Sequence, residues 1–341
     1  MKRIENPHRS KGLDAALPPD CPAPSTDAAR VRHLLKRCPH AGVTPLVDAA
    51  PLARALGLGR LWVKDERARM GLGSFKALGA AYVIACDAED GRAKEQSYVT
   101  ASAGNHGLSV AAGAAAFGAK AVIYLSETVP ESFAERLRAI GAEVRRAGAE
   151  YEASMEAAAQ AAAREGMQLL SDSSWPGYYT RPHRLMEGYL ALMDEVFDQI
   201  DTMPSHILLQ AGVGGLAGAA AAAARAEWGD APQIIVVEPE AAPALMASIT
   251  AGRPVAAPGP VSIMGRLDCK EPSLIALKGL ARDADAFVTL TEAEAQSGCD
   301  LAAAHGLGST PSGAAGLAAL SGLALGAEAR VLCILSEMAD A

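Results

Sequence analysis

The sequence predicts an α/β protein with mostly parallel sheets and helices on both of their faces. From Arg60 onward, short β-type runs alternate with alanine-rich helical stretches, which is the pattern of repeated β-α-β units. Half of the 341 residues are hydrophobic and 21% are charged, so the chain can bury a sizeable core and is not disordered. The 33 glycines suit the turns that such a sheet needs at its edge.

The alternation gives expected bounds for each element. Apolar and β-branched runs predict strands at residues 61–64, 97–100, 121–125, 143–146, 168–171, 206–210, 233–238 and 331–335. Alanine-rich stretches between them predict helices at residues 74–86, 107–117, 132–140, 151–165, 215–227 and 313–325. Parallel strands present ligands at their carboxyl ends, so the glycine-rich turns that follow them should open onto one crevice.

The chain is expected to divide into an arm and two domains. Residues 1–30 are rich in proline and charge and show no periodicity, so we expect an arm that lies on the surface or on a partner subunit. Residues 81–174 are expected to form a small, mobile domain inserted into the chain. The flanking residues 31–80 and 175–341 are expected to form a larger domain, each domain having its own twisted sheet.

Charge and cysteine content exclude several functional classes. The net charge of −8 argues against nucleic acid or an acidic membrane surface as a partner. The longest apolar run, residues 216–224, is shorter than the roughly 20 residues that a membrane span needs. Six scattered cysteines without a CxxC pair indicate reduced thiols rather than a metal or disulfide framework. We therefore expect a soluble cytoplasmic enzyme without a metal site.

A lysine at the start of a predicted helix is the first candidate for chemistry. Lys76 stands among small and apolar residues in Gly71-Leu-Gly-Ser-Phe-Lys-Ala-Leu-Gly79. Loss of solvation and the positive end of the helix dipole are both expected to lower its pKa. A neutral amine at this position can form an imine or carry a proton. A lysine that lies along a helix face with its charge in solvent would do neither.

A second segment joins a predicted strand to a helix through small residues. It reads Val99-Thr-Ala-Ser-Ala-Gly-Asn-His-Gly107. Backbone N–H groups exposed in such a turn suit a carboxylate or a phosphate. Asn105 can donate to a flat ligand that carries oxygen atoms. His106 is either a catalytic group or a residue at the helix start.

The third segment, residues 206–218, predicts a strand, a glycine loop and a helix, which together suit a phosphate. It also matches the G-x-G-x-x-A pattern, and Glu238 ends the next strand twenty residues after Gly218. An acid at that place would bind a ribose hydroxyl in a dinucleotide-binding protein. A nicotinamide-dependent dehydrogenase that uses the Gly212–Gly218 loop is therefore a competing interpretation.

The fourth segment is another turn rich in hydroxyl groups, Gly308-Ser-Thr-Pro-Ser-Gly-Ala-Ala-Gly316. Ser312 in this turn fits a helix N-cap. It also fits a hydroxyl group that forms a hydrogen bond with a heterocyclic nitrogen.

Together and in this order, the four segments resemble the fold-type II (tryptophan-synthase-β-like) pyridoxal-phosphate enzymes. Within them the chain is most similar to the diaminopropionate ammonia-lyases and to the threonine and serine dehydratases. The resemblance runs from about Thr44 to the C-terminus and includes residues 172–178 and 264–272, which look like the diaminopropionate branch. It implies the two-domain fold of this class and the cofactor pyridoxal 5′-phosphate. We also expect a homodimer.

The resemblance implies a role for each segment. Lys76 would hold the cofactor as a Schiff base, with Phe75 beside it. Asn105 would face the ring 3-oxygen, and Ser312 the pyridine nitrogen. The cofactor phosphate would bind to Gly212, Val213, Gly214, Gly215 and Leu216, and the substrate carboxylate to Ser102, Ala103, Gly104, Asn105 and His106.

One position departs from the diaminopropionate branch. That branch carries an aspartate, read as the base for D-isomers, where this chain has Ala103 and the dehydratases have a small residue. Its second acid is present as Asp172, which fits either an N-cap of the following turn or a site carboxylate at the end of a strand. Ala103 therefore predicts that a single stereochemical series, the L series, is processed.

The sequence thus predicts an ammonia-lyase with Lys76 and Asp172 as catalytic residues. It would perform α,β-elimination on a small amino acid with a β-amino or β-hydroxy group and release a 2-oxo acid and ammonia. A threonine or serine dehydratase is the nearest alternative. A β-replacement synthase, a racemase and a silent cofactor-binding homologue also remain open, because the fold does not decide the reaction.

Overall fold

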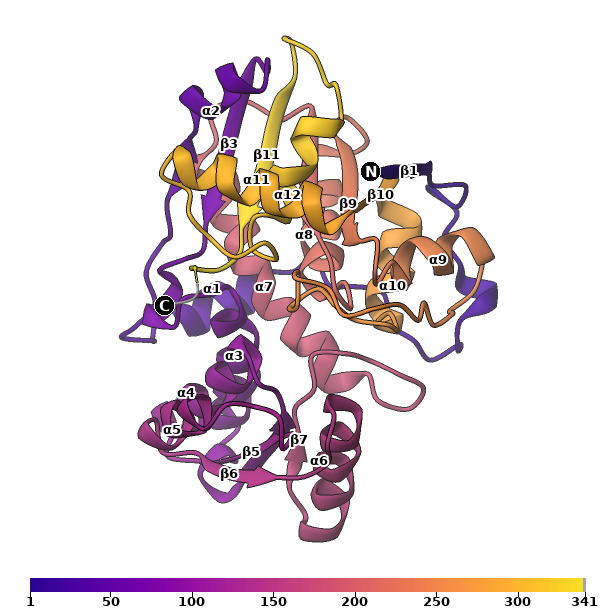
Figure 1. Ribbon diagram of the computed structural model, residues 1–341. Helices are drawn as coiled ribbons and strands as arrows, with labels where there is room; N and C mark the ends of the chain where they lie inside the picture. The colour runs from indigo at the N-terminus through magenta and orange to yellow at the C-terminus, as the bar shows by residue number, and fades with distance from the viewer. Residues whose placement is uncertain (340–341) are drawn as a thin grey trace.

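The computed structural model describes residues 1–339 and contains two sheets, one above the other in Figure 1. The large sheet has the strand order β1-β10-β9-β8-β11-β3-β2, and the small sheet the order β6-β5-β4-β7. The strands of the large sheet are β1 (Lys2–Glu5), β2 (Leu46–Asp48), β3 (Arg60–Asp65), β8 (His206–Gln210), β9 (Gln233–Pro239), β10 (Ala286–Leu290) and β11 (Arg330–Leu335). Those of the small sheet are β4 (Ser97–Ala101), β5 (Lys120–Leu125), β6 (Glu143–Arg146) and β7 (Gln168–Leu169).

Both sheets are parallel apart from two edge strands. In the large sheet only β1 and β2 run antiparallel to their neighbours, and the small sheet is parallel throughout. In register, β11 pairs with β3 from Arg330 opposite Arg60, and with β8 from Val331 opposite His206. The carboxyl ends of β3, β8 and β11 therefore lie at one edge of the large sheet, where parallel sheets bind ligands.

Helices cover both faces of each sheet. On one face of the large sheet lie α7 (Thr180–Gln199), α8 (Gly215–Trp228) and α10 (Leu274–Asp283), and on the other α2 (Ala50–Ala55), α11 (Glu292–Ala304) and α12 (Ala315–Ala319). The small sheet has α6 (Tyr151–Glu165) on one face and α3 (Lys76–Glu89), α4 (Asn105–Ala116) and α5 (Glu131–Ala139) on the other. The helix α1 (Ala29–Leu35) packs against α3 and α7, and α9 (Ala244–Ala251) against α10.

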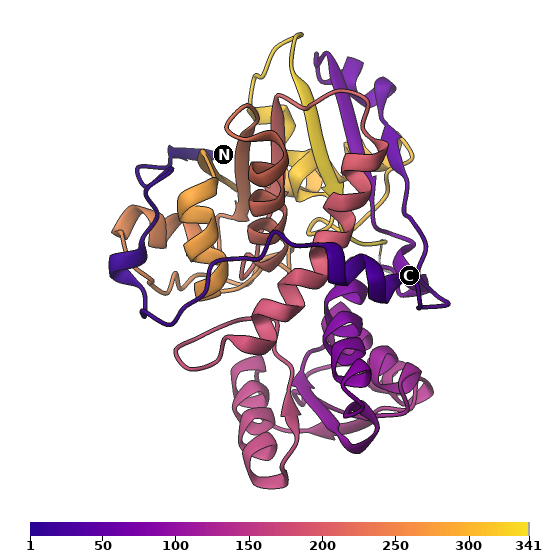
Figure 2. The ribbon, with the colours of Figure 1, turned by 180° about the vertical axis from the view of Figure 1, so that it is seen from behind.

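The long helix α7 joins the two parts of the molecule. It runs between the sheets in Figures 1 and 2 and packs against α3 and α8. Glycines allow its backbone to approach α3 closely, because a Cβ atom on Gly188 would lie 2.5 Å from the Leu78 carbonyl oxygen. A Cβ atom on Gly79 of α3 would in turn lie 2.7 Å from the Tyr189 ring. This close packing fixes the start of α3 relative to α8.

The first residues of the chain lie along its own surface. The strand β1 extends the large sheet, and Asn6 donates hydrogen bonds to the Ala281 and Ala284 carbonyl oxygens at 2.9 and 2.7 Å, at the end of α10. Further on, the segment crosses α7 in Figure 2, where the His183 ring is 3.0 Å from the Ala23 carbonyl oxygen. Residues 1–30 therefore contain regular structure that their lack of periodicity does not predict.

Most strands lie where the alternation predicts them, but one predicted helix is wrong. Residues 313–325 form only the short α12, followed by a 3-10 turn at Leu320–Gly322. The Gly313 carbonyl oxygen accepts hydrogen bonds from Gln210 and Ser336, so this residue belongs to a turn. The residues of β4 to β7 form their own sheet, while the domain limits at residues 81 and 174 and the mobility of this part stay predictions. Within residues 1–339, no helix has the length and hydropathy for crossing a membrane.

Replacement of Gly188 by alanine is expected to lower the free energy of unfolding by about 1–3 kcal/mol. The added methyl group would meet the backbone of α3, which outweighs the better helix propensity of alanine. Urea denaturation followed by circular dichroism measures the effect. Gly42→Ala is the control, since its Cβ would meet nothing within 4 Å. Equal stability of Gly188→Ala and the unchanged protein would show that the close packing of α7 on α3 does not depend on a glycine at position 188.

Candidate active site

The loop before Lys76 is held by the segment that follows the last strand. The Phe75 N–H group donates to the Ser336 carbonyl oxygen at 3.1 Å, and the Met338 N–H group donates to the Gly73 carbonyl oxygen at 2.9 Å. Gly73 has a φ of +78°, and a Cβ atom there would lie 2.6 Å from the Met338 sulfur, so the position requires glycine. Lys76, the first residue of α3, is thereby held near the carboxyl end of β11.

Lys76 forms an ion pair with Asp172 across the two parts of the molecule. The Lys76 Nζ atom is 2.5 Å from the Asp172 Oδ2 atom, and the two side chains are 22% and 21% exposed. Burial alone would lower the pKa of Lys76, but the charge of Asp172 outweighs it and raises this pKa. Burial likewise opposes ionisation of Asp172, yet the Lys76 charge holds the pKa of Asp172 below its ordinary value. The expected lowering of the pKa of Lys76 is therefore wrong in this structure, because its counter-charge is distant in the sequence.

Asp172 does not cap the turn that follows it. The Ser173 and Ser174 N–H groups donate to the hydroxyl oxygens of Ser171 and Ser273, each at 3.2 Å. Asp172 instead follows β7 by three residues and faces Lys76. The N-cap interpretation is wrong, and the catalytic role of Asp172 stays a prediction.

His106 connects the start of α4 to the segment that carries Asp172. The imidazole Nε2 atom lies 2.8 Å from the Leu170 carbonyl oxygen. The Nδ1 atom is buried and has no hydrogen-bond partner among residues 1–339. Burial lowers the pKa of His106, which favours the neutral ring. Since α4 begins at Asn105 with Gly104 as its N-cap, His106 lies inside the helix rather than at its cap.

Asn105, the first residue of α4, contacts Glu337, a glutamate that lies outside the four sequence segments. Its Nδ2 atom donates to the Glu337 Oε2 atom at 2.5 Å. The Thr310 hydroxyl donates to Glu337 Oε1, and the Arg266 Nε atom lies 3.2 Å from Glu337 Oε2. Glu337 is only 4% exposed, so these contacts form inside the protein.

The hydroxyl groups predicted to bind ligands form hydrogen bonds with backbone N–H groups of the protein. Ser312 is 2% exposed, and its Oγ atom accepts the Arg266 N–H group at 3.1 Å. The Ser102 Oγ atom accepts the Gly104 N–H group at 3.3 Å, and the neighbouring Ala103 is exposed. The turn of residues 102–104 therefore lies at the carboxyl end of β4, in front of α4. The ligand roles of these residues stay predictions.

The glycine loop after β8 forms a cradle, which we define as residues 212–216. Gly214 has a φ of +95° and precedes the first residue of α8, so the unbonded N–H groups of this helix start point out of the loop. A Cβ atom on Gly212 would lie 3.0 Å from the Cys269 Sγ atom and 3.1 Å from Leu267 Cα. A helix start with such a compact backbone suits a phosphate group.

Two residues of the site, Tyr189 and Glu337, lie outside the four sequence segments. Tyr189 of α7 has its ring 4.9 Å from that of Phe75, and its hydroxyl interacts with the Lys76 charge. This hydroxyl is buried without a well-formed hydrogen bond within the described residues. Glu337 follows β11 by two residues, so the rule that ligands bind at the carboxyl ends of strands would have indicated it.

Glu238 is not available to a ribose hydroxyl. Its two carboxylate oxygens accept the N–H groups of Leu245 and Met246 at 2.7 and 2.8 Å, at the start of α9, and the residue is 0% exposed. Burial raises the pKa of Glu238 to about 8. The interpretation of the glycine loop as a dinucleotide-binding loop therefore lacks the acidic residue that would bind the ribose hydroxyl.

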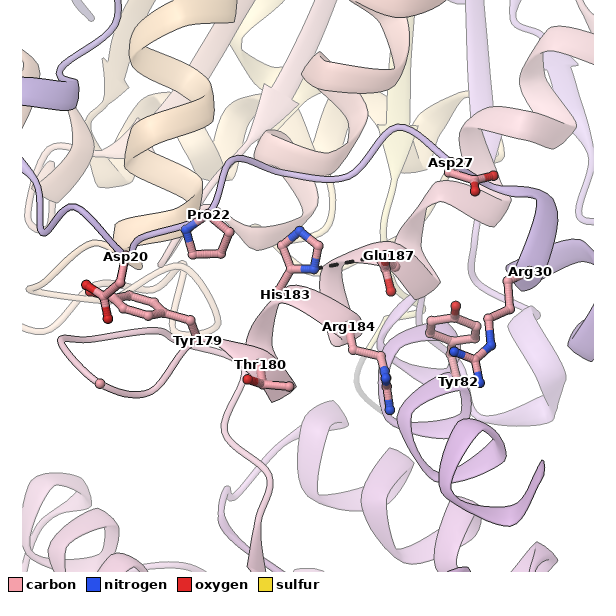
Figure 3. Close-up of a pocket in the computed structure, with 11 residues that line it drawn as sticks. Asp20, Pro22, Asp27, Arg30, Tyr82, Tyr179, Thr180, His183, Arg184 and Glu187 are labelled. Carbon is pink, nitrogen blue, oxygen red and sulfur yellow. Dashed lines mark ion pairs between the residues drawn. The ribbon is translucent and has the colours of Figure 1, made fainter. Parts of the chain in front are cut away.

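A pocket of about 620 Å³ lies away from this site, between the N-terminal segment and α7. Figure 3 shows Asp20, Tyr82, His183 and Glu187 around it, with an ion pair between the last two. None of the predicted site residues lines this pocket. We therefore place the candidate active site at Lys76, Asp172, Asn105 and the cradle.

Comparisons with known proteins show the family of the chain. Residues 38–337 match the family described as "Pyridoxal-phosphate dependent enzyme". The chain is 33% identical over 297 residues to the diaminopropionate ammonia-lyase of Salmonella typhimurium, which covers 79% of this chain and 74% of that protein. It is 29% identical over 229 residues to the serine dehydratase-like protein of Mus musculus, which covers 67% of this chain and 66% of that protein.

The fold is similar to solved structures of the diaminopropionate ammonia lyase of Escherichia coli. The complex of that enzyme with an aminoacrylate-PLP azomethine reaction intermediate has a TM-score of 0.86 and 28% identity, and the match covers 98% of this chain and 93% of that one. The complex of the same enzyme with D-serine has a TM-score of 0.87 and 27% identity, with the same coverage.

Replacement of Asp172 by asparagine is expected to lower the pKa of Lys76. The raising effect of the carboxylate is lost while the lowering effect of burial remains, so more of the amine is neutral near pH 8. Lys76 of the variant should then react faster with an acylating reagent, and the pH midpoint of this reaction should fall. Mass spectrometry of the full chain freed of bound ligands measures both, with exposed Lys120 as the internal reference. An unchanged pH profile would contradict the ion pair.

Proposed function

The chain belongs to the family of pyridoxal-phosphate (PLP) dependent enzymes, and from that membership we propose an ammonia-lyase that acts on small β-substituted amino acids. The reaction is the α,β-elimination of a β-amino or β-hydroxy group, which releases a 2-oxo acid and ammonia. One observation carries the proposal: an amine and a carboxylate, Lys76 and Asp172, in contact where strands of two sheets end. The similarity to a diaminopropionate ammonia-lyase over 79% of the chain supports the same class of reaction.

The residues of the site fit PLP. The cradle offers N–H groups to a phosphate, and Lys76 offers a primary amine that we propose to bind the cofactor covalently. The Tyr189 hydroxyl, buried beside Lys76 without a well-formed hydrogen bond within the described residues, can bond a polar ligand atom or the amine itself. When bound, the cofactor supplies a conjugated electron sink that makes the substrate Cα–H group acidic.

Lys76 is the proposed base that takes the Cα proton, after the amine of the substrate has displaced it from the cofactor. It can accept a proton only as a neutral amine, whereas the ion pair with Asp172 favours the ammonium form. A ligand that separates Lys76 from Asp172 therefore activates the amine, because burial then lowers its pKa. The base becomes active only when the site is occupied.

Asp172 is the proposed acid that protonates the leaving group. Burial opposes its ionisation, and its pKa is held low chiefly by the charge of Lys76, to which hydrogen bonds from Lys76 and from its own backbone N–H group add. When Lys76 carries no charge, burial raises the pKa of Asp172 and the carboxyl group can hold a proton. An amine or hydroxyl group leaves the β-carbon more easily when it is protonated as the bond breaks.

The turn of residues 102–104 and the start of α4 are proposed to bind the substrate carboxylate. Gly104 is the N-cap of α4, so the first N–H groups of this helix have no partner within the helix. A carboxylate at this place is stabilised by those groups and by the helix dipole. It would fix the Cα atom relative to Lys76.

A dehydratase that removes a β-hydroxy group is the second candidate, and Ala103 favours it. The side chain of Ala103 is exposed and carries no acid at the place where the diaminopropionate branch has an aspartate. A site with Asp172 as its proposed acid is expected to process a single stereochemical series, and we propose the L series.

The proposal also includes assembly and location. We propose a homodimer in the cytoplasm. All six cysteines are unpaired, which supports a reducing compartment. Light scattering after size-exclusion chromatography measures the mass of the assembly, and a monomer would contradict the dimer.

Purified protein is expected to release a 2-oxo acid and ammonia from L-2,3-diaminopropionate or L-serine faster than from the D-isomers. The assay uses both enantiomers of these two amino acids and of threonine. Equal or faster turnover of D-isomers would contradict the inference from Ala103. A colourless protein that binds a nicotinamide nucleotide would contradict the proposed function as a whole.

Asp172→Asn is expected to slow elimination by about 10²-fold or more, the usual scale for loss of an acid–base group. The visible absorbance of the bound cofactor should remain, because Lys76 is unchanged. Asp198→Asn is the control, since this carboxylate is exposed on α7. Turnover within a few-fold of that of the unchanged protein would contradict the proposed role as an acid and would leave Asp172 a structural role alone.

A further inference from the structure

Glu337 is a buried carboxylate that contacts three of the loops of the site. Its backbone forms an isolated β-bridge with Ser74, next to the loop that carries Lys76. Its side chain accepts hydrogen bonds from Thr310, in the turn that contains Ser312, and from Asn105, at the start of α4. Three of the four sequence segments therefore meet at Glu337, which belongs to none of them.

The groups around this side chain suit a carboxylate and not an amide. Thr310 donates to Oε1, Asn105 donates to Oε2 at 2.5 Å, and Arg266 adds a positive charge 3.2 Å from Oε2. An ionised carboxylate has only acceptor sites, so both of its oxygens can accept these donors. Glutamine at the same place would turn an NH2 group toward one set of donors.

This arrangement fixes the orientation of the Asn105 amide. An amide group has a donor end and an acceptor end, and only the NH2 end can face the carboxylate favourably. The opposite orientation would place the Asn105 carbonyl oxygen against a carboxylate oxygen, so that two acceptors are in contact and this charge-assisted hydrogen bond is lost, which is costly. The second hydrogen of the same NH2 group remains for another acceptor.

We propose that Glu337 is a positioning residue that holds the donor end of Asn105 toward the cofactor. The Asn105 amide would then donate one hydrogen to Glu337 and the other to an oxygen of the bound cofactor. Asn105 stands between β4 and the body of α4, in the part built on the small sheet, while Glu337 follows β11 of the large sheet. The contact therefore also joins the two parts at the cofactor.

The test is a double-substitution cycle read by cofactor affinity. The full chain is freed of cofactor by dialysis against an amine that captures PLP, and PLP is then titrated while tryptophan fluorescence is followed. Glu337→Gln and Asn105→Ala are each expected to weaken PLP binding by about tenfold or more, the scale of a hydrogen bond to a charged group. The double variant should be no weaker than Asn105→Ala alone, because Glu337 acts through Asn105.

A matched control comes from Glu195, a glutamate that is partly buried. Glu195 also accepts hydrogen bonds from an arginine, Arg69, and from a threonine, Thr44, but it does not contact Asn105. Glu195→Gln should lower the temperature of unfolding and leave PLP affinity within about threefold. If Glu337→Gln does not fold, Glu337→Asp takes its place in the cycle, since the shorter side chain withdraws the charge from Asn105.

Two results would overturn the inference. One is PLP affinity of the Glu337 variant within threefold of that of the unchanged protein. The other is a double variant whose loss equals the product of the two single losses. The inference rests on the proposed cofactor site but not on turnover, so failure of the elimination assay on the unchanged protein would leave this measurement intact.

Discussion

A buried amine needs an opposite charge, and Lys76 finds it in a residue 96 positions further along the chain. The loop before α3 is held by the segment after β11 of the large sheet, and Asp172 follows β7 of the small sheet, so this contact links the two sheets. The charge of each group shifts the pKa of the other, so the amine is favoured in its protonated form and the carboxyl group in its ionised form.

Elements with a strong local pattern could be predicted from the sequence, and those defined by distant partners could not. The apolar runs of β8 and β9 and the alanine-rich α6 lie where the alternation predicts them. The strand β1 consists of three charged residues and Ile4 at a sheet edge, and only its pairing with β10 makes it a strand. The helix α7 carries charged residues throughout its length, which hides the apolar face buried against α3 and α8.

The same division holds for the site. The resemblance placed Lys76, Asn105 and the glycine loop together because each belongs to a motif with its own order in the chain. Glu337 was missed because it stands alone after the last strand, and its importance follows from contacts with residues as far as 232 positions away. Glu238 shows the reverse, since a correct spacing suggested a ligand role while the fold uses both oxygens at the start of α9.

The pairing of the segment Ser336–Met338 with the loop before Lys76 has a consequence for how the protein acquires activity. The Gly73 carbonyl oxygen can accept the Met338 N–H group only when β11 has been added to the middle of the large sheet. Contacts between such distant parts of a chain form late in folding, because closing a long loop costs entropy before any bond forms. Partly folded molecules would thus lack a finished binding site, and uptake of the cofactor would mark those molecules that have completed their fold.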